Sequence, residues 1–141
     1  PLASGAIQLR LSEALTILPV LFSEAVPAVF VGCLVVNLIS GAPAPDIILG
    51  SAITLAAAIL TCVLSKRIKN ISAKLFVGGI FPVILNAFLL PLIWQFYIGT
   101  QEYIYIVQAV LLLISQSIAV YAVGVPLALS VVKLKQKNKL Q

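Results

Sequence analysis

Long apolar runs, separated by two clusters of basic residues, constrain this chain more than any other feature. The basic clusters lie at 66–74 and 133–139, and each follows a long apolar run. Of the 141 residues, 62% are hydrophobic and only 9% are charged, and the mean hydropathy is +1.17. Soluble domains carry about 25% charged residues. A chain with so few polar groups cannot cover its own surface in water, so the sequence predicts an integral membrane protein.

The apolar runs predict an all-α, polytopic membrane helix bundle in a single domain, residues 1–141. A helix over 12–22 is long enough for only about half a bilayer. The glycines and prolines at 78–91 interrupt the fourth run, and Gly124 and Pro126 predict a bend in the fifth. The expected helices are 12–22, 24–40, 47–65, 75–94 and 103–132.

The two basic clusters predict the orientation of these helices. Lys and Arg are concentrated in cytoplasmic loops of membrane proteins. If 66–74 is cytoplasmic, the helices that follow place 133–139 on the same side, so the two clusters agree. We therefore expect a multi-pass protein of the cell membrane with a cytoplasmic C-terminus. Although the net charge is +5, this distribution is typical of membrane loops and argues against nucleic acid as a partner.

The stretch 5–15 is unusually polar for this chain. It contains Gln8, Arg10, Ser12 and Glu13, and the predicted orientation places it at the outer face of the membrane. Arg10 is therefore an exception to the positive-inside preference. Arg10 and Glu13 are three residues apart, so on a helix they share one face. This stretch is predicted to form the mouth of a binding site.

The same orientation collects further polar side chains in the outer half of the bundle. Most of them are amides, and an Asn or Gln side chain offers a donor and an acceptor side by side, which matches the edge of a purine-like base. Aromatic side chains nearby can stack on such a ring, and Glu13 can hold a cationic amine. The predicted ligand-binding residues are Gln8, Arg10, Glu13, Asn37, Asn86, Gln108, Tyr105 and Trp94.

Each of these residues also has a purely structural explanation. Arg10 and Glu13 can form an ion pair at the membrane interface. The amides, and Gln116 with them, can form hydrogen bonds between helices. Asp46 is interpreted as a turn or helix-cap residue rather than as part of the site, and the aromatic residues can belong to the interface or the core. The sequence leaves both interpretations open.

No signature of an enzyme appears in the sequence. There is no Gly-rich phosphate loop ending in Lys-Ser or Lys-Thr, and the absence of histidine excludes Ser-His chemistry and the usual metal sites. Cys33 and Cys62 lie in apolar runs without metal-ligand spacing. We therefore expect no catalytic residue, no metal and no cofactor, and any energy for concentrating a solute would come from other subunits.

Four segments resemble QueT-type proteins, which are substrate-binding (S) components of energy-coupling-factor transporters. The segments are IQLRLSEAL at 7–15, FVGCLVVNL at 30–38, DIILGS at 46–51 and FPVILNA at 81–87. The resemblance covers essentially the whole chain. It implies a bundle of six helices with the ligand site toward the outside. Since five helices are visible and the chain opens on Pro1 without any methionine, the first helix is expected to be missing at the N-terminus.

The resemblance also implies a function and partners. An S component captures its ligand outside the cell and docks on a transmembrane coupling subunit driven by two ATPase subunits. For QueT-type proteins the ligand is a queuosine precursor, a deazaguanine base. Two alternatives remain at this point, an S component for another vitamin-like solute and a membrane scaffold subunit without a ligand.

Overall fold

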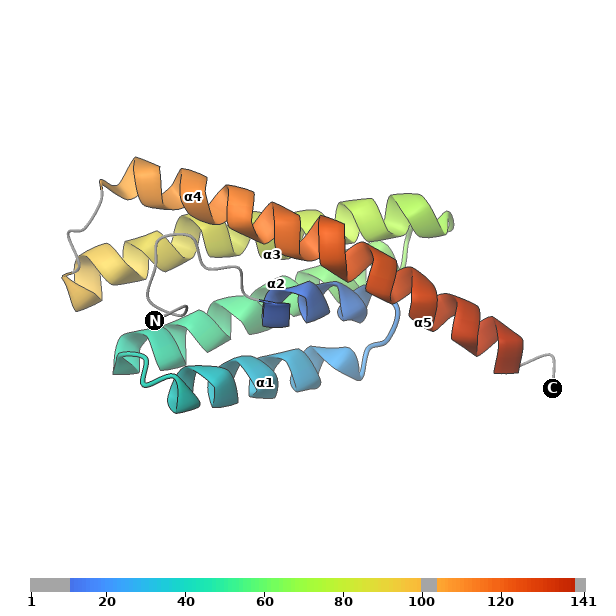
Figure 1. Ribbon diagram of the computed structural model, residues 1–141, viewed down its shortest axis with the longest axis horizontal. Helices are drawn as coiled ribbons and strands as arrows, with labels where there is room; N and C mark the ends of the chain where they lie inside the picture. Colours follow the sequence, from blue (N-terminus) through green and yellow to red (C-terminus); the bar gives the residue numbers. More distant parts are fainter. Residues whose placement is uncertain (1–10, 100–103, 139–141) are drawn as a thin grey trace.

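The chain forms an elongated bundle of helices that run along its long axis (Figure 1). The computed structural model describes residues 11–99 and 104–138. Within these two ranges the regular elements are all helical, and no strand occurs among them. The predicted all-α helix bundle is confirmed.

Five helical segments follow one another along the described chain. The first is the short 3-10 helix η1, Leu11–Val20, and the second is α1, Ala25–Ile39. The third begins as the wide turn η2, Asp46–Gly50, and continues as α2, Ser51–Ser65. The fourth is α3, Ile71–Ile93, extended by η3, Trp94–Ile98. The fifth is continuous through α4, Tyr105–Ser117, η4, Ile118–Gly124, and α5, Val125–Asn138.

Three of these segments are long and apolar enough to cross a membrane. They are Asp46–Ser65, Ile71–Tyr97 and Tyr105–Asn138, whereas Ala25–Ile39 is apolar but shorter. Large apolar side chains point outward from the bundle, among them Phe76 and Ile106. Side chains of this kind are stable on an outer surface when lipid surrounds them, so the membrane assignment from composition agrees with the fold.

Helix α3 is longer than expected, and its prolines do not break it. It begins at Ile71 because the side chain of Asn70 caps it, accepting a hydrogen bond from the Ser72 N–H at 3.0 Å. Pro82 lacks the N–H that would bond the carbonyl of Gly78. The Thr61 hydroxyl of α2 donates to that carbonyl at 2.9 Å. A neighbouring helix thus restores the bond that proline removes, as is common inside membranes.

The last helix extends into the basic tail and ends at Asn138, beyond the predicted end at residue 132. Lysine is a good helix former, and Lys135 Nζ lies 5.1 Å from the centre of the Phe22 ring. This cation–π contact holds the end of α5 against the turn between η1 and α1. The predicted bend near Gly124 corresponds to the wide turns of η4 immediately before Pro126.

The short helix η1 lies inside the bundle and packs against α1, α2, α3, η4 and α5. Its side chains Ile17 and Val20 are completely or almost completely buried. Gly124 of η4 approaches its backbone so closely that a Cβ at this position would lie 2.6 Å from the carbonyl oxygen of Ala14. This contact fixes the backbone next to Glu13.

The two ends of the bundle differ in the segments they carry. The α1–α2 connection, η3 and the start of α4 lie at one end (Figure 1). The η1–α1 turn, the α2–α3 connection and the end of α5 lie at the other. Both basic clusters therefore fall at the same end.

Candidate functional site

Helices η1 and α3 bring two of the predicted site residues into contact. Asn86 Nδ2 donates a hydrogen bond to Glu13 Oε2 at 3.2 Å. Only 6% of Glu13 and 1% of Asn86 are exposed. Burying an ionisable side chain among apolar helices is costly, and in membrane proteins such residues are typically functional. We call this pair the Glu13 cluster.

A second polar cluster lies where α2 begins and α3 ends. Trp94 Nε1 donates to Asp46 Oδ1 at 3.2 Å. Gly50 lies beside both Asp46 and Asn37, because a Cβ at Gly50 would be 3.1 Å from Asp46 Oδ1 and 3.8 Å from Asn37 Nδ2. Asp46 and Asn37 are both buried. We call Asp46, Trp94 and Asn37 the Asp46 cluster.

One face of α3 connects the two clusters. Asn86, Leu90 and Trp94 follow one another at intervals of four residues, so they lie on the same side of the helix. At a rise of about 1.5 Å per residue, the backbones of Asn86 and Trp94 are roughly 12 Å apart. Leu90 lies between them and would be 3.5 Å from a Cβ at Gly50. Asn86 of one cluster and Trp94 of the other thus lie about two turns apart on one face of α3, with Leu90 between them on that face.

The other predicted site residues have varied surroundings. Gln108 is buried on α4. Tyr105 is only partly buried, and its hydroxyl donates to the Phe88 carbonyl at 3.0 Å, so it ties α4 to α3. Gln8 and Arg10 lie outside the described residues.

The sequence interpretation set aside Asp46, which the structure joins to a predicted site residue. Asp46 does lie in the first turn of its helix, as a cap residue would, but the N-cap position belongs to Pro45. The carboxylate of Asp46 instead accepts the indole N–H of Trp94, 48 positions later in the chain. No local sequence pattern indicates a contact over this separation.

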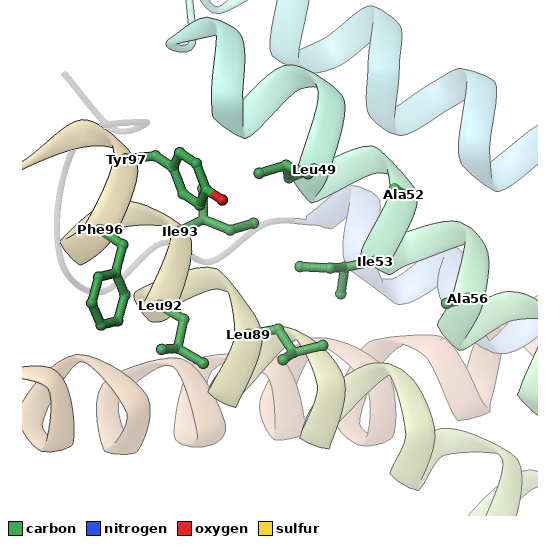
Figure 2. Close-up of a pocket in the computed structure, with 9 residues that line it drawn as sticks. All are labelled: Leu49, Ala52, Ile53, Ala56, Leu89, Leu92, Ile93, Phe96 and Tyr97. Atoms are coloured by element: carbon green, nitrogen blue, oxygen red, sulfur yellow. The ribbon is translucent and has the colours of Figure 1, made fainter.

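A wide groove opens on the bundle surface between α2 and the second half of α3 (Figure 2). It has a volume of about 750 Å³, and the phenol of Tyr97 supplies the only polar side-chain group among its lining residues. Such a surface cannot satisfy the polar edge of a purine-like ligand. We therefore place the candidate site at the two polar clusters. The groove is lined by Leu49, Ala52, Ile53, Ala56, Leu89, Leu92, Ile93, Phe96 and Tyr97.

Replacing Asp46 by alanine is expected to lower stability by about 1–3 kcal/mol, because the hydrogen bond from the Trp94 indole N–H to the Asp46 carboxylate is lost. Trp94 is the single tryptophan of the chain, so the position of its fluorescence emission reports on this contact directly. Thermal unfolding and emission spectra of the purified protein measure the two effects. Asp46→Asn, which keeps an acceptor oxygen, should lose less stability, and equal losses in the two variants would contradict the assigned bond.

Comparison with known proteins gives one family match. The model of the family described as QueT transporter matches residues 1–133. Comparison with curated proteins and with solved structures found no match.

Proposed function

The chain belongs to the QueT transporter family, and from this premise we propose that it is the membrane-embedded S component of an energy-coupling-factor transporter. In this role it captures its solute from outside the cell and catalyses no reaction. Uptake is driven by a transmembrane coupling subunit and two ATPase subunits. The family match and the apolar spanning helices support this proposal.

The proposed solute is a queuosine precursor, a deazaguanine base. The observation that carries this part of the proposal is the hydrogen bond between Glu13 and Asn86, both of which are buried inside the bundle. A carboxylate and an amide at one point suit a ligand with an amine and a base edge. Gln108 and the Asp46 cluster would add further polar contacts, with Trp94 positioned beside them.

The proposed orientation has the C-terminus in the cytoplasm. Both basic clusters fall at one end of the bundle, and the positive-inside preference assigns that end to the cytoplasm. The Asp46 cluster, at the start of α2, then lies toward the outside. A solute that arrives from outside the cell then has a shorter path to the Asp46 cluster than one that arrives from the cytoplasm.

Binding calorimetry with 7-aminomethyl-7-deazaguanine, followed by uptake measurements, tests this proposal. We expect heat of binding with the purified protein, and uptake only when the coupling and ATPase subunits are present. Heat with a vitamin such as riboflavin but none with the deazaguanine would indicate an S component for another solute. Unchanged cellular function after replacing both Glu13 and Asn86 by leucine would favour a scaffold role instead.

A further inference from the structure

Three buried amide oxygens in the described part of the chain have no hydrogen-bond donor. They are Asn86 Oδ1 on α3 and the Oε1 atoms of Gln108 and Gln116 on α4. The three residues are 1%, 7% and 3% exposed. Buried polar atoms in folded proteins are almost always paired, so an unpaired one calls for an explanation. The Ser51 hydroxyl oxygen on α2 is a further atom of this kind among the described residues.

The three residues follow the contact between α3 and α4. These helices run antiparallel, with Gly79 against Val120 toward one end and Phe88 bonded to Tyr105 toward the other. Asn86 therefore lies at a level between Gln108 and Gln116.

Gln108 and Gln116 share the buried face of α4. They are separated by about 12 Å along the helix axis, at a rise of roughly 1.5 Å per residue. Leu112 and Ser115 lie on the same buried face between them.

All three unpaired atoms are acceptors, which restricts what can pair with them. A carbonyl oxygen accepts hydrogen bonds and cannot donate one. The amide nitrogen of Asn86 already donates to the Glu13 carboxylate, so it is the Asn86 oxygen that is left without a partner. Such oxygens favour a ligand with several N–H groups over a ligand that presents a carboxylate, because a carboxylate has no hydrogen to donate to them.

We propose that Asn86, Gln108 and Gln116 form an acceptor seam between α3 and α4 that pairs with the N–H groups of the transported solute. Gln116 is then a specificity-determining residue that the predicted site did not include. The seam selects neutral or cationic heterocycles rich in N–H donors over carboxylate-bearing solutes. This inference rests on the proposed function of the chain as a solute-binding component, but not on the identity of the solute.

The variant Gln116→Met tests the seam, since methionine has a similar length and lacks the amide oxygen. In the ligand-free protein the thermal midpoint should rise by about 2–4 °C, because a buried acceptor without a donor is removed. The Kd for a bound donor-rich heterocycle should rise by about tenfold. A merely structural glutamine would lower stability when replaced, so the opposite signs of these two effects distinguish a ligand contact from a structural one.

Gln136→Met is the matched control, because Gln136 is an exposed residue of the same continuous helix. It should change neither the thermal midpoint nor the Kd. A fall in the midpoint of Gln116→Met, or an unchanged Kd, would overturn the seam.

The ligand panel separates this inference from the proposed solute. It consists of 7-aminomethyl-7-deazaguanine, thiamine as a second donor-bearing cation, and biotin and pantothenate as carboxylate-bearing solutes. If only thiamine binds, and Gln116→Met raises its Kd, the proposed seam is supported and the deazaguanine assignment is wrong. If a carboxylate-bearing solute binds more tightly than both donor-rich probes, the seam is wrong even if the chain is an S component.

Discussion

Replacing Gly124 by alanine is expected to destabilise the protein by about 3 kcal/mol, at the upper end of the usual overpacking range. The added Cβ would lie 2.6 Å from the carbonyl oxygen of Ala14 and 3.2 Å from Ile17 Cγ2. A backbone oxygen cannot move aside as the end of a side chain can, so η1 must shift. Because Glu13 precedes Ala14, the shift should also disturb the Glu13–Asn86 bond and weaken ligand binding.

The matched control for this change is Gly32→Ala. Gly32 lies within α1 and would meet nothing within 4 Å after the substitution. Alanine there is expected to stabilise the helix by up to about 1 kcal/mol, since glycine is the poorer helix former. Thermal unfolding in detergent should therefore move in opposite directions for the two variants. A Gly124→Ala protein as stable as Gly32→Ala would contradict the close approach of η4 to η1.

The class of fold could be predicted from the sequence because it depends on local properties of each segment. The length and apolarity of each run decide whether it can span a bilayer, and the five expected helices correspond to the five observed segments. Thr54, Ala57 and Thr61 recur at helical spacing, so they share one face of α2, and all three are buried. The interruption expected at Pro82 was wrong, because the compensating hydroxyl of Thr61 comes from another helix.

The contacts between site residues could not be predicted in the same way. Glu13 and Asn86 were conspicuous as polar residues in apolar runs. No sequence pattern, however, indicates that these two positions, 73 residues apart, are in contact. Asp46 had a sufficient local explanation as a cap, which concealed its contact with Trp94. Polar residues in membrane segments can thus be selected from the sequence alone, but their partners depend on how the helices pack.

Glu13→Gln is expected to weaken binding of 7-aminomethyl-7-deazaguanine by about 10- to 100-fold, because a charge-assisted hydrogen bond to the ligand amine becomes a neutral one. The fold should persist, since glutamine has nearly the same size and its oxygen can still accept from Asn86. Calorimetry gives the Kd, and the thermal midpoint should change by less than about 3 °C. Glu24→Gln is the control, because Glu24 is exposed and its side chain makes no capping bond to α1. Equal losses in the two variants would indicate a bulk charge effect.

A ligand without the amine makes this prediction more specific. If Glu13 holds the aminomethyl group, 7-methyl-7-deazaguanine should bind the natural protein and the Glu13→Gln variant with nearly the same affinity. The two proteins and two ligands form a double-mutant cycle, in which the non-additive part isolates the contact between carboxylate and amine. A coupling near zero would mean that the amine lies elsewhere, and the Asp46 carboxylate would then be the next position to test. A large coupling would assign one end of the ligand to η1 and would orient the base toward α3 and α4.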